Sequence, residues 1–249
     1  MKEELTAAIV IIGNEVLSGR VQDKNVEFIA KGLSEKGIIL KEVRIIPDLE
    51  EYIIDTVNFL RAKYSYIFTT GGIGPTHDDI TSLSVAKAFG SEYVRNQEAY
   101  AQIKDYYEKK NMPLNEAREK MAYMPSNAKL INNDLTKAPG FVIENLFVMA
   151  GIPEIMQNMF SYVLEQLKSS EKIESKNIKI YIGESLIAKD LEIIQNKYPD
   201  IDIGSYPFLF GYEKHGTDVV FRGNNREALN NSYEELKSIF ISKNYEFEL

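Results

Sequence analysis

The sequence contains no cysteine and only two histidines. The absence of cysteine excludes disulfide bonds, thiolate zinc sites, iron–sulfur clusters and a cysteine nucleophile. Two histidines cannot form a three-histidine metal site unless a partner chain supplies the third. Any metal ion bound by this chain must therefore have mainly oxygen ligands.

Positive charge and long apolar runs are also scarce. The chain has 29 Lys and Arg against 37 Asp and Glu, a net charge of −8. This charge opposes binding to a phosphate backbone, so we expect no nucleic-acid partner. The apolar run at residues 7–12 is too short for a signal-peptide core, and no run approaches the roughly 18 apolar residues of a membrane span. We therefore expect a cytoplasmic protein with no membrane partner.

Periods typical of strands and of helices alternate in the first part of the chain. Residues 7–12 form a mostly β-branched run, which is typical of a strand buried on both faces. Three βα units in a row predict an α/β fold with an open, mostly parallel sheet covered on both faces. Further strands are expected at 43–46 and 66–70, and helices at 49–63, at 80–89 and from Val26 to just before Gly37.

The stretch from 96 to 124 is polar and helix-rich, and we expect it to be an insertion without strands. After it, 141–143 and 146–150 predict a hairpin connected by Glu144-Asn145. A helix with Pro153 in its first turn is expected to follow.

The composition changes to Ser, Lys and Glu at residues 168–177, which predicts a linker. The linker would separate a first domain, 1–167, from a second domain, 178–249. The second domain is expected to be a small α+β domain of βαββα order. Its strands are expected at 178–182, 201–206 and 217–221, and its helices at 186–198 and 226–240.

The residues with chemical potential follow the predicted strands. In an open parallel sheet, ligands bind outside the carboxyl ends of the strands. Gly13 and Gly151, which follow two of these strands, are candidate ligand-binding residues. We expect one crevice lined by four loops: Gly13-Asn14-Glu15, Pro47-Asp48, 71–79 and 151–154.

The loop at 71–79 is the most informative segment. Gly71, Gly72 and Gly74 allow the backbone to approach a ligand closely, and the helix that follows favours a phosphate group. Asp78 and Asp79 would repel that phosphate, and a divalent cation between carboxylate and phosphate oxygens removes the conflict. The alternative is a capping box, with Thr76 as N-cap and Asp79 as its partner. Spacing alone leaves both interpretations open.

Other polar residues have two interpretations each. Glu15 is a candidate metal ligand or a solvated acid. Asn25 is expected to cap a helix, and it could instead hold a substrate hydroxyl. Lys137 could bind a pyrophosphate, although an exposed lysine is the ordinary case. His77 could donate a hydrogen bond to a phosphate, or it could be an ordinary surface residue. Arg118 and Lys120 are expected to be solvated.

Several segments form a set that is specific to one family. They are Gly13-Asn14-Glu15, Asp23-Lys24-Asn25, residues 71–81 (GGIGPTHDDIT), Ala138-Pro139-Gly140-Phe141 and Gly151-Ile152-Pro153. This set resembles the MoaB/Mog molybdopterin-binding domain family, especially the CinA amino-terminal region and the molybdopterin-binding-like domain of eukaryotic FAD synthase. The likeness continues through 181–185 and 204–207. It implies a three-layer MoaB/Mog-like domain at 1–167, followed by a KH-like domain.

The family is functionally divided. MoaB and Mog proteins bind or adenylylate molybdopterin, whereas CinA and the FAD synthase domain resemble metal-dependent pyrophosphatases that act on ADP-ribose or FAD. The resemblance implies catalytic and metal-binding roles for Asp78 and Asp79, metal binding by Glu15 and a hydrolytic role for Glu184. It assigns the phosphate loop to Gly71, Gly72, Gly74 and Thr76. The sequence departs from the family at Asn14, at Ala150 and at Glu119-Lys120-Met121.

The expected activity is metal-dependent hydrolysis of a nucleotide pyrophosphate of the ADP-ribose or FAD type, with Mg, Mn or Co as cofactor. The alternative is a non-catalytic module that binds molybdopterin or a nucleotide. No deamidase or adenylyl-transfer domain is recognised, so we expect the module to act alone, as a homo-oligomer. The KH-like resemblance does not change the nucleic-acid prediction, because residues 168–249 are acidic and lack a Gly-x-x-Gly loop.

Overall fold

The chain folds into two compact units, Met1–Ser170 and Glu171–Leu249. The computed structural model describes residues 4–210 and 214–249. Each unit has its own sheets and its own hydrophobic cores, so each is described by itself.

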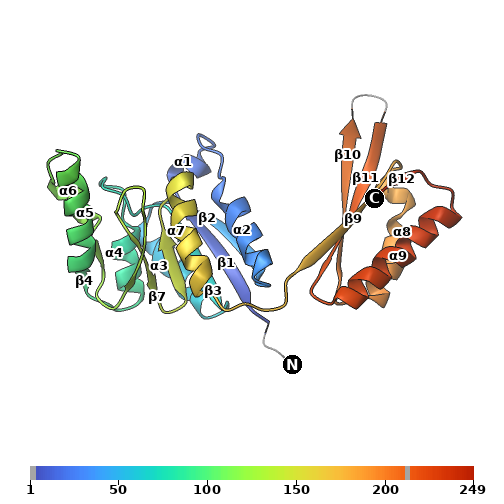
Figure 1. Ribbon diagram of the computed structural model, residues 1–249, viewed down its shortest axis with the longest axis horizontal. Coiled ribbons are helices and arrows are strands. Elements are labelled where there is room, and N and C mark those ends of the chain that lie inside the picture. The colour runs from blue at the N-terminus through green and yellow to red at the C-terminus, as the bar shows by residue number, and fades with distance from the viewer. Residues whose placement is uncertain (1–3, 211–213) are drawn as a thin grey trace. The chain divides into compact units, whose positions relative to one another are not determined.

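The first unit contains a six-stranded sheet in the order β2-β1-β3-β8-β7-β6 (Figure 1). The strands β2, β1, β3 and β8 are parallel, whereas β7 and β6 run antiparallel to their neighbours. The predicted mostly parallel sheet and the β7–β8 hairpin are therefore confirmed. The strands are β1 (Thr6–Ile12), β2 (Ile39–Ile46), β3 (Tyr66–Thr70), β6 (Lys129–Ile131), β7 (Gly140–Ile143) and β8 (Leu146–Met149).

Helices cover both faces of this sheet, because β1 buries every second residue on each side. Val10 of β1 packs in the same core as Val57 and Val85 of α3 and α4. Ile9 packs in a second core with helices α2 and α7. The result is three layers. The helices are α1 (Asn14–Leu17), α2 (Asn25–Glu35), α3 (Glu50–Arg61), α4 (Thr81–Ala88), α5 (Gln97–Lys109), α6 (Glu116–Lys120) and α7 (Pro153–Gln166).

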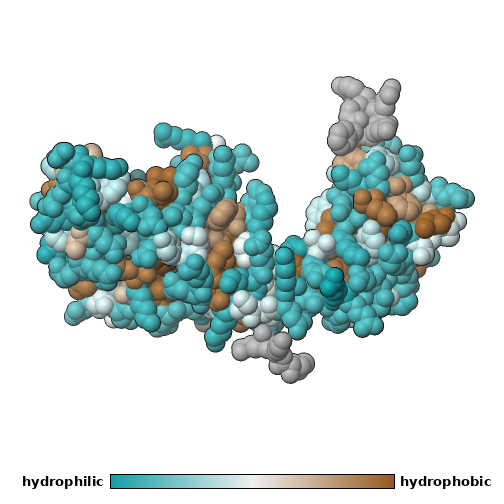
Figure 2. All heavy atoms as spheres, viewed as in Figure 1, coloured by the Kyte–Doolittle hydropathy of each residue, from teal (hydrophilic) through white to brown (hydrophobic). Residues whose placement is uncertain are grey.

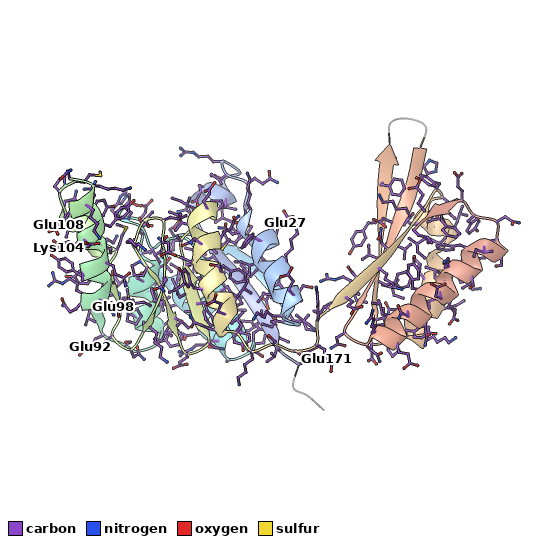
Figure 3. All side chains as sticks on the ribbon, in the orientation of Figure 1. Glu27, Glu92, Glu98, Lys104, Glu108 and Glu171 are labelled. Atoms are coloured by element: carbon purple, nitrogen blue, oxygen red, sulfur yellow. The ribbon has the colours of Figure 1, made fainter. Side chains whose placement is uncertain are left out.

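The expectation that residues 96–124 contain no strand is wrong. The strand β5 (Tyr123–Pro125) pairs antiparallel with β4 (Tyr93–Arg95). Strands of three residues are too short to show an alternating pattern, and the contact of the Tyr93 and Tyr123 rings, 5.6 Å apart, becomes visible only in the fold. Helix α5 of the same segment turns Lys104 and Glu108 outward (Figure 3) and buries Ile103.

The strand β2 lies at an edge of the sheet and carries a polar network. Glu42 accepts hydrogen bonds from Tyr64 at 2.6 Å, Arg44 at 2.7 Å and Lys63 at 3.1 Å. Hydrogen bonds from Tyr64 and then from Arg44 lower the pKa of Glu42 to about 2. The carboxylate is therefore held ionised at this edge.

The second unit is an antiparallel sheet, in the order β10-β11-β9-β12, with two α-helices. The predicted βαββα order is confirmed, and a short strand that was not predicted, β12, follows it and pairs with β9. The first strand begins at Glu174, inside the segment expected to be a linker, because its polar residues pair with β11 despite their composition. The elements are β9 (Glu174–Ile180), a 3₁₀ helix (Glu184–Leu186), α8 (Ala188–Lys197), β10 (Asp202–Phe210), β11 (Lys214–Gly223), α9 (Arg226–Ser242) and β12 (Phe247–Glu248).

The visible surface is mostly hydrophilic, with small groups of hydrophobic residues (Figure 2). No helix in residues 4–210 and 214–249 is long and apolar enough to cross a membrane.

Candidate functional site

The carboxyl ends of the parallel strands open into a cavity of about 590 Å³. All four loops predicted to meet there contribute to its wall, and the insertion adds Tyr107 and Met121. Residues from these loops that line it include Glu15, Asp48, Gly71, Gly72, Gly74, Asp78, Asp79, Gly151 and Pro153. We call this space the main cavity.

The floor of the main cavity requires glycine at two adjacent positions. Gly71 has φ of 103°, and a Cβ atom there would lie 2.1 Å from the carbonyl oxygen of Ile12. Gly72 has φ of 69°, and its Cβ would lie 2.1 Å from the Thr81 hydroxyl oxygen. Other residues would meet both backbone strain and a clash. The loop can therefore present bare backbone to a ligand.

Two further glycines leave room for carboxylates. A Cβ atom on Gly13 would lie 2.4 Å from Oε1 of Glu15, and one on Gly74 would lie 2.8 Å from Oδ2 of Asp79. Both carboxylates thus fold back over backbone that has no side chain. Gly13 and Gly74 therefore leave space for the carboxylate groups of Glu15 and Asp79.

Asp79 closes a turn that ends before the helix. Its Oδ2 accepts hydrogen bonds from the Thr76 backbone N–H at 2.7 Å and from the Thr76 hydroxyl at 2.5 Å. Helix α4, however, begins at Thr81, and its N-cap, Ile80, makes no side-chain cap. The contact proposed for a capping box exists, but the N-cap assignment of Thr76 is wrong.

Asp78, beside this turn, is exposed to the solvent. The Thr76 hydroxyl is the largest influence that lowers the pKa of Asp78, followed by the backbone, with smaller contributions from His77 and Lys120. Asp78 therefore stays ionised next to the glycine loop.

The ionisable side chains that line the main cavity in the described part of the chain are all acidic. Four carboxylates line it, from Glu15, Asp48, Asp78 and Asp79, and none of the lining residues in the described part of the chain is Lys, Arg or His. The Asp48 carboxylate also accepts a hydrogen bond from the Asn14 backbone N–H at 2.8 Å. The sequence pattern predicts Asp48 in one of the four loops but indicates no role for it. A phosphate in this cavity would need a cation beside it.

These carboxylates do not form a ready-made metal cage. Within residues 4–210 and 214–249, no group of three or more His, Asp or Glu side chains is close enough to hold a metal ion. Mg²⁺ often takes only one or two carboxylates and completes its shell with water and substrate phosphate oxygens. The donor set fits an ion that is shared with a phosphate ligand.

Asn25 is buried, and its role as helix cap is wrong. The α2 N-terminus is bonded instead by Asp23, whose Oδ1 accepts from the Val26 N–H at 2.9 Å. The Asn25 Nδ2 donates to the Gly151 carbonyl oxygen at 2.9 Å, while its Oδ1 has no partner in the part of the chain described. Asn25 therefore ties α2 to the loop after β8.

The basic candidates behave differently from one another. The Lys137 ammonium pairs with Asp134 at 2.7 Å and does not line the main cavity. His77 is fully exposed. The expectation of solvated side chains is wrong for Arg118, which stacks 4.1 Å over the Tyr107 ring, and for Lys120, which donates to the Thr76 carbonyl oxygen. The contact of Lys120 spans 44 residues of sequence, so no local pattern could indicate it.

Glu184 belongs to the second unit. It is exposed and begins the 3₁₀ helix, where its Oε2 accepts a 3.5 Å hydrogen bond from the Ser205 hydroxyl. Its hydrolytic role stays a prediction.

Comparisons with known proteins agree with this geometry. Residues 8–169 match the family described as "Probable molybdopterin binding domain", and residues 172–246 match "FAD synthase, middle domain". A protein of Archaeoglobus fulgidus is 31% identical over 94% of this chain and 98% of its own length. A CinA-like protein of Sulfurihydrogenibium sp. is 30% identical over 98% of this chain and 62% of its own length.

One solved structure also resembles the chain. The protein CinA of Thermoplasma acidophilum, described as having unknown function, has a TM-score of 0.61 and 27% identity, and the match covers 66% of this chain and 99% of that one. The chain therefore belongs to the probable molybdopterin binding domain family, and the segment that follows this domain is similar to the FAD synthase middle domain.

Proposed function

We propose that this protein hydrolyses a nucleotide pyrophosphate of the ADP-ribose or FAD type with the help of a divalent metal ion. The observation that carries the proposal is the main cavity, where a bare glycine backbone suited to phosphate lies among four carboxylates with no basic side chain in the described lining. A cation shared with the substrate reconciles the two features. The match to the FAD synthase middle domain supports a nucleotide substrate.

Residues of this chain have distinct tasks in the proposed reaction. The loop from Gly71 to Gly74 binds the pyrophosphate. One or two of the carboxylates of Asp78, Asp79 and Glu15 would hold the cation, and water and phosphate oxygens would complete its ligands. The cation would neutralise charge on the phosphates and lower the pKa of a bound water molecule. For Glu184, which belongs to the second unit, the family resemblance implies the role of a general base that accepts a proton from water.

The turn between Thr76 and Asp79 serves this chemistry by fixing one carboxylate. Two hydrogen bonds orient the Asp79 carboxylate before substrate arrives. The apolar side chains of Ile73, Met121 and Ile152 line the same cavity and offer apolar surface beside the pyrophosphate.

The second candidate function is binding of molybdopterin or a nucleotide without catalysis. The description of the family that matches residues 8–169 favours it. An apolar wall of Ile12, Ile155 and Met159 would suit a pterin ring as well as a nucleotide base. Only turnover separates the two functions.

The test is AMP release from ADP-ribose and FAD with Mg²⁺, Mn²⁺ or Co²⁺ present, and with EDTA. We expect AMP only when a metal ion is present, and loss of AMP release in Asp78→Asn. A matched control is Asp105→Asn, because Asp105 lies on α5, outside the main cavity, and pairs with Lys109 at 2.7 Å. If no AMP is released with any of these substrates and metal ions, the hydrolase proposal is refuted and the non-catalytic binding function remains. Light scattering would test the expected homo-oligomer.

A further inference from the structure

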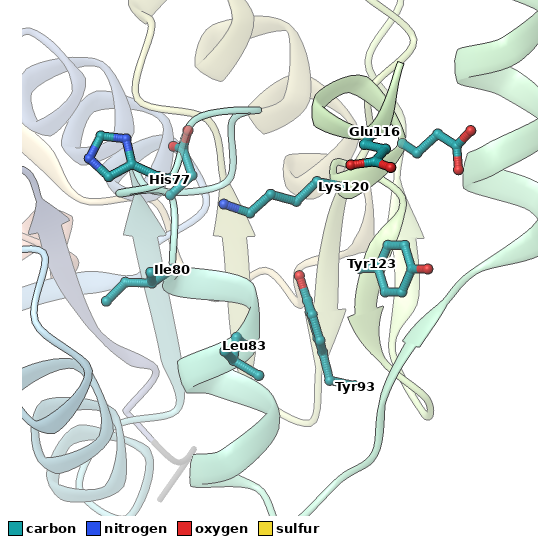
Figure 4. Close-up of a pocket in the computed structure, with 9 residues that line it drawn as sticks. His77, Ile80, Leu83, Tyr93, Glu116, Lys120 and Tyr123 are labelled. Carbon is teal, nitrogen blue, oxygen red and sulfur yellow. The ribbon is translucent and has the colours of Figure 1, made fainter. Parts of the chain in front are cut away.

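A second cavity, of about 440 Å³, lies on the other side of the glycine loop. It is lined by residues of the loop, of helices α4 and α6 and of strands β4 and β5 (Figure 4). Its lining residues are His77, Asp79, Ile80, Leu83, Tyr93, Glu116, Glu119, Lys120 and Tyr123. We call this space the insertion pocket.

The insertion pocket and the main cavity share a wall. Asp79 lines both spaces, and the neighbouring residues Lys120 and Met121 line one each. The Lys120 ammonium donates to the carbonyl oxygen of Thr76, so the wall is fastened to the insertion. A ligand with its pyrophosphate on the glycine loop thus has a second space next to its phosphates.

The lining of the insertion pocket suits an aromatic ring. Figure 4 shows Ile80 and Leu83 on one side and Tyr93 and Tyr123 on the other. The Tyr93 and Tyr123 rings are tilted by 42° and form a continuous aromatic wall. Burial raises the pKa of Tyr93, which is consistent with a partly desolvated wall. Bases stack well on such side chains.

The charges in the insertion pocket select against phosphate and for hydroxyl groups. Asp79, Glu116 and Glu119 supply three carboxylates against one ammonium from Lys120. Glu119 also pairs with Arg95 at 3.7 Å, whereas Glu116 has no ion pair in the segments that the structure describes. A free carboxylate can accept hydrogen bonds from the hydroxyls of a ribose.

We propose that the insertion pocket binds the uncharged nucleoside half of a pyrophosphate substrate, with the ring on Tyr93 and Tyr123 and the sugar hydroxyls toward Glu116. This inference rests on the proposed function, and it names the substrate as a nucleotide joined through its pyrophosphate to a second group. Each half then has its own space, with the phosphates on the glycine loop between them.

The test measures binding of phosphate-free ligands that carry the ring and the sugar or sugar-alcohol chain. Leu83 lines the insertion pocket but not the main cavity, so Leu83→Trp would fill the insertion pocket with a change outside the main cavity's own lining. Glu116→Gln would remove only a charge at an exposed position. Because the chain has no tryptophan, Ile193→Trp on an exposed part of α8 is a matched single-tryptophan control. Melting temperatures would confirm that each variant folds.

The probes are adenosine, riboflavin and inorganic pyrophosphate with Mg²⁺, each titrated by calorimetry or ligand-observed NMR. We expect wild type to bind at least one nucleoside and Leu83→Trp to bind it at least tenfold more weakly, about 1.4 kcal/mol. Glu116→Gln should weaken it less, and pyrophosphate affinity should change less than about twofold. Ile193→Trp should match wild type.

Two results would overturn the proposal: neither nucleoside binds wild type, or Leu83→Trp binds it as wild type does. Failure of the proposed function gives a different result. If no dinucleotide is hydrolysed but nucleoside binding still depends on Leu83, the insertion pocket remains a nucleoside-binding site. Only the proposed hydrolase function is then refuted.

Discussion

Replacing Asp79 with asparagine should separate catalysis from stability. Asp79 accepts two hydrogen bonds from Thr76, at 2.7 and 2.5 Å, and asparagine keeps an oxygen acceptor for them. Complete loss of a comparable side-chain bond to the backbone costs about 1 kcal/mol. In a protein of this size that corresponds to a fall in melting temperature of roughly 2–4 °C, so Asp79→Asn should lower it by no more than this. Turnover should nevertheless be abolished, because the charge that holds the cation is gone.

The assay combines AMP release, nucleotide affinity and thermal melting for Asp78→Asn and Asp79→Asn. Asp78 lines the same cavity, so its variant should also lose turnover and should melt close to wild type. The reasoning is refuted if both variants bind nucleotide more tightly without metal and wild type shows no metal-dependent hydrolysis. In that case the carboxylates only repel the ligand.

The remaining predictions concern the metal, the second unit, a buried amide and acid stability. EDTA should weaken nucleotide binding to wild type at least tenfold, about 1.4 kcal/mol, in calorimetry; equal affinity would remove the need for a cation. Glu184→Gln should lower turnover by about 100-fold with nucleotide affinity nearly intact, and unchanged kcat would place Glu184 outside the chemistry. Asn25→Ala should reduce unfolding free energy by about 1–3 kcal/mol in denaturant melts, because the Gly151 carbonyl loses its donor; a neutral result would mean the bond is dispensable. Glu42→Gln should melt lower than wild type at pH 7, and the difference should shrink as pH falls from 4.5 toward about 2, since a lowered pKa stabilises the fold only while the group is ionised. A difference independent of pH would contradict the assigned pKa.

The sequence predicted the elements whose signal is local and periodic. The run at residues 7–12 and the βα alternation located the parallel sheet because burial on both faces requires continuous apolar residues. The strand-end rule then located the main cavity, since the ends of parallel strands meet at one edge. The motif at 71–79 indicated part of the lining, including Gly71, Gly72, Gly74, Asp78 and Asp79, whereas the predicted ligand-binding residues Gly13, Asn25, Thr76 and Lys137 do not line the cavity.

The features that were missed depend on contacts between distant segments. Strand β5 contains only Tyr123–Pro125 and is held by pairing with β4. The early start of β9 at Glu174 likewise depends on its partner β11, because its own residues are polar. The contact of Lys120 with the Thr76 carbonyl forms only when the insertion folds against the loop. Local pattern carries none of this information.

The edge strand β2 has a consequence for the behaviour of the protein at high concentration. A free strand edge is a template on which another molecule can extend the sheet, and Val43 and Ile45 of β2 are exposed. Lys41, Glu42 and Arg44 alternate with these apolar residues, and charges at an edge discourage such growth. Glu42 is anchored to its own molecule through Tyr64 and Arg44, so its charge is fixed beside the exposed edge. The network that keeps this carboxylate ionised therefore also disfavours intermolecular sheet extension, and strong acid, which protonates Glu42, would weaken that effect.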